Sequence, residues 1–243
     1  LYDMRPMAKL AGQIAIAALT WAMGFRVGAI ELPFELLLTS AAPVSFLVTV
    51  GWIVIVSNAF NLIDGIDGLT AGVSVITALT VFLLANQNGA TVPVIAALAL
   101  SGALAGFLRF NLPPARIFLG DAGALSIGYV TAVLAMASYQ KSPAAVALIV
   151  PLLVLGLPLL DPILAVLRRG LSHLRRRGAE GLRPGEMLHA VTLADRGHLH
   201  HLLLRNGLSL SESLAVLYAV CIALAAVGLG TREASTTLRW GLF

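Results

Sequence analysis

The feature that most constrains the fold is a series of long apolar segments, each about the length of a membrane-spanning helix. Seven can be read, at roughly 10–25, 44–60, 70–86, 91–108, 123–139, 144–168 and 211–229. The 243 residues are 58% hydrophobic and 12% charged, whereas a soluble domain carries about 25% charged residues. Segments of this length favour helices over the short alternating strands of a membrane barrel. We therefore predict an all-α, polytopic membrane helical bundle of about seven transmembrane helices, in which residues 1–243 form a single domain.

Two segments are expected to depart from straight helices. The stretch Phe25 to Ser40 contains Pro33 between two glutamates, and we expect a small hairpin there. The segment 144–168 contains three prolines, which predict a bent or broken helix. The single cysteine, Cys221, lies in an apolar run and excludes a disulfide framework.

The basic residues divide unequally between the two ends of the predicted helices. If the loops alternate, one side receives Arg5, Lys9, Arg109, Arg116, Arg168, Arg169, Arg175, Arg176, Arg177, Arg183, Arg196 and Arg205. The other side receives only Arg26, Lys141, Arg232 and Arg239. Since Lys and Arg accumulate in cytoplasmic loops, we predict that loops at about 1–9, 58–69, 109–122 and 170–208 are cytoplasmic. All four carry polar motifs, which indicates a single site on that face.

The loop at 58–69 gathers acceptor groups at a membrane boundary. Its polar residues, Asn58, Asn61, Asp64 and Asp67, recur every third position, so on a helical turn they would lie close to one face. Ionisable groups are expensive at such a boundary and indicate a site. The alternative is that the aspartates only cap neighbouring helices.

A second motif, FLGDAGAL from Phe118 to Leu125, places Asp121 between two glycines at the start of a predicted helix. Asn111, Arg109 and Arg116 lie just before it. A helix start beside a carboxylate and arginines can hold a metal–diphosphate unit. The alternative is again a helix cap.

A third motif, RGHLHH, brings His198, His200 and His201 together with Arg196. Because no cysteine or fourth histidine is close, a phosphate-binding or proton-handling cluster is favoured over structural zinc. Asp161 lies inside a predicted helix, where it either pairs with Arg168 to fix packing or faces a substrate.

Together these motifs resemble the polyprenyl-phosphate N-acetylhexosamine-1-phosphate transferase family (glycosyltransferase family 4). The loop 58–69 is similar to the family's Asn/Asp loop, and Phe118 to Leu125 to its Phe-Met-Gly-Asp-x-Gly-Ser motif, with Leu119 and Ala124 as departures. HLHH resembles the His-x-His-His motif of the GlcNAc-1-phosphate branch. The start, LYDMRP, resembles the tail of an Asp-Asp-x-x-Asp motif whose first two aspartates would precede Leu1. The chain therefore resembles an N-terminally truncated member.

The resemblance implies a phosphotransferase of the bacterial plasma (inner) membrane with a cytoplasmic active site. It would transfer a HexNAc-1-phosphate, foremost GlcNAc-1-phosphate, from a UDP-N-acetylhexosamine to polyprenyl (undecaprenyl or decaprenyl) phosphate. UMP would leave, in the first membrane step of the synthesis of a cell-envelope polysaccharide such as lipopolysaccharide or teichoic acid. Mg²⁺, with Mn²⁺ as an alternative, would be the cofactor. The bilayer is a partner, a homodimer stays open, and no nucleic acid is expected.

The resemblance also assigns roles to single residues. Asp121 would be the metal ligand. Asp64 and Asp67 would organise the nucleotide pocket with Asn58 and Asn61, and the resemblance counts both aspartates as catalytic. The three histidines, His198, His200 and His201, are also counted as catalytic and would hold the diphosphate or sugar with Arg196. The other expected substrate contacts are Lys9 at a phosphate, and Gly68, Leu69, Asn111 and Phe118 near the uracil.

Two alternatives remain. A phospho-MurNAc-pentapeptide translocase would use the same chemistry on another donor, although that branch carries three consecutive histidines. A membrane transporter is the alternative from a different class, suggested by Asp161 in a proline-broken segment.

Overall fold

The structure is a computed structural model that describes residues 4–26, 31–32, 36–37, 42–139, 155–160, 164 and 199–240. Its helices are α1 (Pro6–Ala22), α2 (Ala42–Ile63), α3 (Leu69–Gln87), α4 (Thr91–Asn111), α5 (Gly120–Tyr139), α9 (Leu199–Arg205) and α10 (Leu210–Trp240). Two short strands, β1 (Glu31–Leu32) and β2 (Leu36–Leu37), pair antiparallel. The predicted all-α fold class is confirmed, and so is the small hairpin.

Five of the described helices are long and apolar enough to cross a membrane. They are α2, α3, α4, residues Gly120–Ser138 of α5 and residues Leu210–Gly230 of α10. Helix α1 has 17 residues and is about 26 Å long at 1.5 Å per residue, which is less than a hydrocarbon core about 30 Å thick. The predicted segment 144–168 lies outside the described residues apart from 155–160 and 164.

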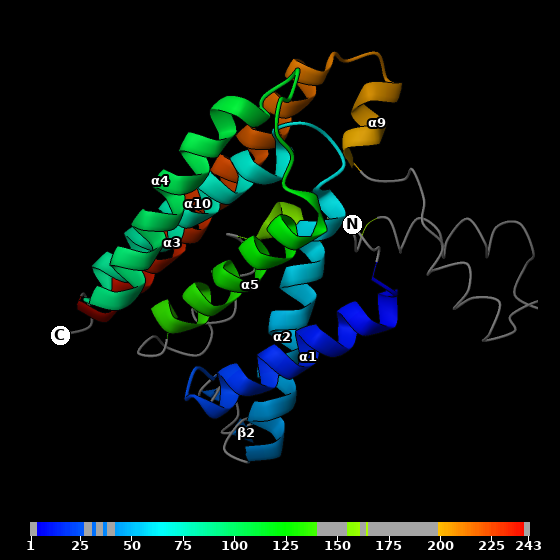
Figure 1. Cartoon of the computed structure of the whole chain (residues 1–243). Helices are drawn as coiled ribbons and strands as arrows, with labels where there is room; N and C mark the ends of the chain where they lie inside the picture. The colour runs from blue at the N-terminus through cyan, green and yellow to red at the C-terminus, as the bar shows by residue number, and fades with distance from the viewer. Residues whose placement is uncertain are drawn as a thin grey trace, which may run out of the picture.

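The helices form two groups, which contact each other mainly through α3 and α5. Helix α3 packs between α4 and α10, and α2 packs along α5 with α1 crossing α2 (Figure 1). Helices α3 and α4 also contact α5. The loop between α2 and α3 and the loop between α4 and α5 consequently lie close to the start of α10.

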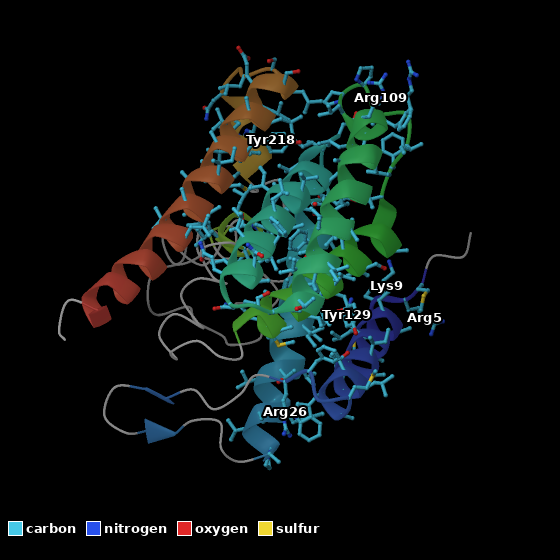
Figure 2. All side chains as sticks on the ribbon, turned by 90° about the vertical axis from the view of Figure 1, so that its left-hand side faces the viewer. Arg5, Lys9, Arg26, Arg109, Tyr129 and Tyr218 are labelled. Atoms are coloured by element: carbon cyan, nitrogen blue, oxygen red, sulfur yellow. The ribbon has the colours of Figure 1, made fainter. Side chains whose placement is uncertain are left out.

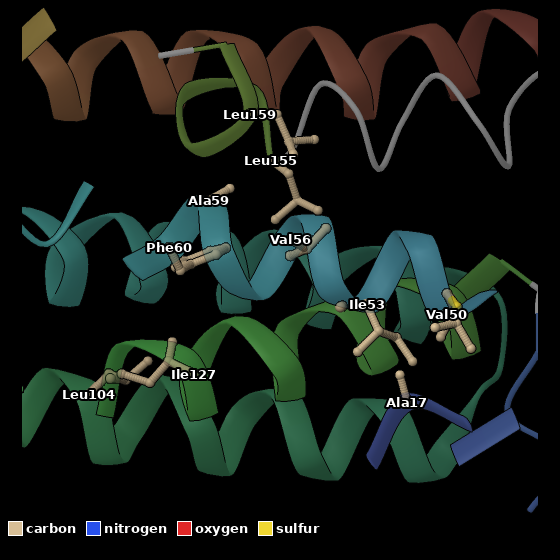
Figure 3. Close-up of a cluster of buried hydrophobic side chains, with 12 residues drawn as sticks. Ala17, Val50, Ile53, Val56, Ala59, Phe60, Leu104, Ile127, Leu155 and Leu159 are labelled. Atoms are coloured by element: carbon tan, nitrogen blue, oxygen red, sulfur yellow. The ribbon is translucent and has the colours of Figure 1, made fainter. Parts of the chain in front are cut away.

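The main core lies on α2. Ile53, Val56 and Phe60 are almost fully buried there and pack with side chains of α1, α4 and α5 (Figure 3). The apolar face of α2 is thus covered by protein, whereas Leu47 and Ile55 on the same helix are exposed, as expected for lipid contact. Because lipid is as apolar as these side chains, close packing rather than water exclusion holds such helices together.

Gly128 allows α2 and α5 to approach closely. A Cβ atom at this position would lie 2.7 Å from Ser57 Cα and 3.1 Å from Phe60 Cβ. Small residues at helix crossings of this kind are characteristic of membrane bundles. The contact fixes the depth at which Asn61, one turn beyond Ser57, meets the start of α5.

Helix α10 begins at a reciprocal capping box. The Ser209 backbone N–H donates to Glu212 Oε2 at 2.8 Å, and the Glu212 N–H donates back to Ser209 Oγ at 3.3 Å. This arrangement satisfies two of the free N–H groups at a helix start. The turn between α9 and α10 is thereby held in one conformation.

We predict that Gly128→Ala lowers stability by about 1–3 kcal/mol, because the added methyl group meets backbone atoms of α2 that cannot move aside cheaply. Thermal unfolding in detergent measures the effect. Gly102→Ala is the matched control, since a Cβ there would meet nothing within 4 Å. An unfolding temperature equal in the two variants would contradict the close approach.

Candidate active site

The two loops that carry the polar motifs are joined by Asn111, the last residue of α4. Its Oδ1 accepts a hydrogen bond from the Gly68 backbone N–H at 3.1 Å, and its Nδ2 donates to the Ile117 carbonyl at 2.9 Å. The Asn111 side chain is buried. One carboxamide therefore connects the α2–α3 loop to the α4–α5 loop.

Asp67 makes a second connection between the same loops. Its Oδ2 accepts a hydrogen bond from the Ala115 N–H at 3.0 Å. The following residue, Gly68, precedes α3 with φ +83°, a conformation that side-chain-bearing residues rarely adopt. The chain can therefore turn directly from the loop into α3 while Asp67 faces the α4–α5 loop.

The carboxylate of Asp121, in the first turn of α5, is exposed. Oδ2 forms an ion pair with the Lys9 ammonium of α1, and Oδ1 accepts a hydrogen bond from Asn61 Nδ2 of α2 at 3.2 Å. The side chains of Lys9 and Asp121 are 27% and 57% exposed, and Figure 2 shows Lys9 at the site end of α1. Three helices thus bring a carboxylate, an ammonium group and an amide to one accessible point.

Asp64 lies in the α2–α3 loop and is half-buried. Burial is the main cause that raises the pKa of its carboxyl above the ordinary value, and the charge of Asp121 raises it further. The Thr70 hydroxyl nearby lowers the pKa in part, although Thr70 Oγ1 makes no hydrogen bond of ordinary geometry. The charge of Asp121 therefore affects the ionisation of Asp64.

An apolar cluster attaches α9 to the α2–α3 loop. Leu199 and Leu203 of α9 pack against a buried group that includes Ile63 and Leu69 on either side of the loop. Leu217 of α10 belongs to the same cluster. The backbone of α9, which includes His200 and His201, is consequently held near the loop. The histidine side chains are outside the described part of the structure.

The polar residues of the predicted 58–69 motif form hydrogen bonds with different partners. Asn58 Nδ2 donates to Gln13 Oε1 of α1 at 2.5 Å and to the Val54 carbonyl at 2.8 Å, so both its N–H groups are used within the bundle. Asn61 contacts Asp121, and Asp67 contacts the α4–α5 loop. Residues at this spacing therefore join α2 to α1 and α5, and join the loop after α2 to the α4–α5 loop.

The remaining predicted residues differ in accessibility. Leu69 is only 1% exposed and packs in the apolar cluster, whereas Phe118 is 71% exposed just before α5. His198, Arg196, Asp161 and the chain before Met4 lie outside the described residues. Whether these residues contact a substrate stays a prediction.

Sequence reasoning missed Gln13 and Tyr218. Tyr218 of α10 donates its hydroxyl hydrogen to the Gly68 carbonyl at 2.6 Å. Both residues lie inside apolar helices and belong to no polar motif. The sequence indicates only that each is a hydrogen-bonding side chain within an otherwise apolar segment.

Within the described residues, no group of three or more His, Cys, Asp or Glu side chains is placed to hold a metal ion. A divalent cation at Asp121 would therefore depend on oxygen ligands from substrate phosphates, water or residues outside the described ranges.

We predict that Asp64→Asn changes how stability depends on pH. Because the folded-state pKa of Asp64 is raised, ionising this group weakens the folded state. Wild-type stability relative to the variant should therefore rise as pH falls from the raised pKa toward 3.8, the ordinary value. Unfolding temperatures of both proteins across this range, measured in EDTA, test the sign. A wild type that loses stability relative to Asp64→Asn as pH falls would contradict it.

The chain is similar over most of its length to membrane phosphotransferases. A probable undecaprenyl-phosphate N-acetylglucosaminyl 1-phosphate transferase of Bacillus subtilis (strain 168) is 31% identical over 219 residues, which are 90% of this chain and 57% of that protein. A decaprenyl-phosphate N-acetylglucosaminephosphotransferase of Mycobacterium tuberculosis (strain H37Rv) is 32% identical over a match that covers 89% of this chain and 55% of that protein. The chain thus spans little more than half the length of these relatives.

A shorter similarity reaches a third kind of transferase. The phospho-N-acetylmuramoyl-pentapeptide-transferase of Lactobacillus johnsonii is 43% identical over 130 residues, which are 51% of this chain and 40% of that protein. Residues 1–139, more than half of the chain, match glycosyl transferase family 4. This match includes α1 to α5 and with them Lys9, Asn61, Asn111 and Asp121. The chain therefore belongs to glycosyl transferase family 4.

Proposed function

We propose that the protein transfers a HexNAc-1-phosphate, foremost GlcNAc-1-phosphate, from a UDP-sugar to polyprenyl phosphate and releases UMP. The family and the two long similarities to polyprenyl-phosphate GlcNAc phosphotransferases support this reaction. The single observation that carries it is the group formed by Asp121, Lys9 and Asn61 at an accessible point beside the membrane-spanning helices.

The reaction joins two phosphate groups that repel each other. An oxygen of the acceptor phosphate attacks the β-phosphorus of the UDP-sugar, a new P–O bond forms, and the bond to the bridging oxygen of the α-phosphate breaks with UMP as leaving group. The acceptor phosphate is largely ionised at neutral pH, so it needs no strong base. Catalysis then rests on positioning and on neutralising charge. Lys9 brings a positive charge to the same point as Asp121.

Asp121 is the residue we propose to hold Mg²⁺ or, as an alternative, Mn²⁺. Its exposed carboxylate suits an ion that binds through one or two carboxylates together with water and phosphate oxygens. Asp64, whose pKa responds to the charge of Asp121, is near enough to add negative charge. When bound, Mg²⁺ would supply positive charge to the reacting phosphates.

The α2–α3 and α4–α5 loops form the proposed nucleotide side of the site. Asp67, Gly68 and Asn111 belong to a hydrogen-bonded wall, with Asp64 in the same loop. The exposed ring of Phe118 offers a surface on which a uracil could stack. The attachment of α9 to this wall supports the proposal that the histidine segment, with Arg196, contacts the diphosphate or sugar.

We further propose that the site faces the cytoplasm at the bacterial inner membrane, where UDP-sugars are available. The excess of basic residues on the site's side supports this orientation. The product would be the lipid-linked first sugar of a cell-envelope polysaccharide, such as teichoic acid or lipopolysaccharide.

We predict that Asp121→Asn reduces Mg²⁺-dependent UMP release from UDP-GlcNAc by about 100-fold or more, because it removes the proposed metal ligand. The assay uses the protein in membranes with polyprenyl phosphate, with and without EDTA. Glu212→Gln is the control, since it makes the same carboxylate-to-amide change at the α10 cap and keeps an acceptor for Ser209. Undiminished release by Asp121→Asn would overturn the assignment.

A donor panel separates the proposed sugar from the translocase alternative. We expect UMP release with UDP-N-acetylhexosamines and not with UDP-MurNAc-pentapeptide. Release with the pentapeptide donor alone would contradict the proposed substrate while leaving the phosphotransfer reaction intact. Passage of a solute across vesicles without UMP formation would favour a transporter.

A further inference from the structure

A tyrosine of the last helix contacts the wall of the proposed nucleotide site from within the bundle. The Tyr218 hydroxyl donates to the Gly68 carbonyl at 2.6 Å, across 150 residues of sequence. The same carbonyl also accepts from the Gly72 N–H at 2.9 Å. Both acceptor positions of the Gly68 carbonyl are therefore used, one by α3 itself and one by α10.

Gly72 makes room for the Tyr218 ring. A Cβ at Gly72 would lie 2.1 Å from the Tyr218 hydroxyl oxygen and 2.2 Å from Cζ. A Cβ at Gly68 would lie 3.5 Å from the same oxygen, and Gly68 also needs its positive φ. The Tyr218 ring thus packs directly against the backbone of α3 at Gly72. The hydrogen bond to Gly68 is therefore accompanied by close packing.

The other polar group of Gly68 is held from the opposite side. Its N–H donates to Asn111 Oδ1, which belongs to α4. Gly68 is consequently fixed between α4 and α10, and neither Asn111 nor Tyr218 can move without changing the start of α3. We call this arrangement the Gly68 bracket, formed by Asn111, Gly68 and Tyr218.

Helix α10 also supports α9, whose backbone includes His200 and His201. Leu214 and Leu217, which precede Tyr218 on α10, belong to the apolar cluster that contains Leu199 and Leu203 of α9. The same two turns of α10 therefore contact the α2–α3 loop through Tyr218 and α9 through leucines. The position of α10 therefore determines the spacing between the α2–α3 loop and α9.

We propose that Tyr218 is a positioning residue that sets the nucleotide wall of the site through Gly68. The expected effect on donor binding rests on the proposed transferase function, whereas the expected effect on the conformation around Gly68 does not. Tyr218 does not contact Lys9, Asn61 or Asp121 in the described hydrogen bonds, so its removal should disturb donor binding more than the chemical step.

Tyr218→Phe in the full chain tests this role with the ring retained. We expect the KM for UDP-GlcNAc to rise about fivefold, because a hydrogen bond is lost from a carbonyl that keeps one partner. The kcat and the KM for polyprenyl phosphate should each change less than about twofold. An unchanged KM for UDP-GlcNAc, or an equal loss in all three constants, would overturn the proposal.

Tyr129→Phe is the matched control. Its hydroxyl also makes an interhelical hydrogen bond, to Thr20 at 2.8 Å, but Tyr129 lies elsewhere along the bundle (Figure 2). We expect its KM for UDP-GlcNAc to match the wild type. A rise equal to that of Tyr218→Phe would show a general loss of packing and would overturn the specific role.

A second measurement does not depend on activity. Amide hydrogen exchange over residues 64–72 should be faster in Tyr218→Phe than in the wild type and unchanged in Tyr129→Phe. Exchange that is the same in all three proteins would refute the bracket. Absence of UMP release by the wild type would instead refute the proposed function and leave the exchange result to decide the bracket.

The contact between Gly72 and the Tyr218 ring can be tested by a double-mutant cycle. Gly72→Ala should lower the unfolding temperature because the methyl group collides with the Tyr218 ring. In Tyr218→Ala the ring is gone, so adding Gly72→Ala should lower the temperature much less. Strictly additive effects of the two substitutions would contradict the contact.

Discussion

The arrangement of the site depends on how a single glycine is held. Gly68 turns the chain from α2 into α3 with a positive φ, and its N–H and carbonyl are bound by side chains of α4 and α10. A larger residue would be strained by the backbone angle and would crowd Leu112 and Leu214. Because both backbone polar groups of Gly68 are paired, this residue leaves no unsatisfied backbone group at the edge of an apolar bundle.

The membrane environment explains why the site is built from a few side-chain contacts. Apolar helices gain little from packing against each other instead of lipid, so their positions depend on close approaches and on hydrogen bonds. Gly128 supplies such an approach between α2 and α5, and the Asn58–Gln13 hydrogen bond joins α2 to α1. These contacts bring Lys9, Asn61 and Asp121 to one point although they belong to three helices.

Much of this fold could be predicted from hydropathy alone. The predicted segment 70–86 corresponds to α3 almost residue for residue, because its ends coincide with Gly68 and a polar turn. Helix α4 extends past the predicted end because Arg109 reads as loop, and α10 continues beyond residue 229 for the same reason. The sequence placed the loops of Asn61 and Asp121 at the same end of the bundle, but it did not predict the hydrogen bond between them. The partners Gln13 and Tyr218 could not be found, since they lie inside apolar helices and their contacts span 45 and 150 residues.

The central claim is that the protein moves a sugar together with one phosphate, and the fate of the two phosphorus atoms of the donor tests it most directly. UDP-GlcNAc labelled at the β-phosphorus would be supplied with polyprenyl phosphate to membranes containing the protein. We expect the label to enter the lipid, with one unlabelled UMP formed for each labelled lipid. Release of the label as UDP, with only the sugar joined to lipid, would contradict the proposed reaction.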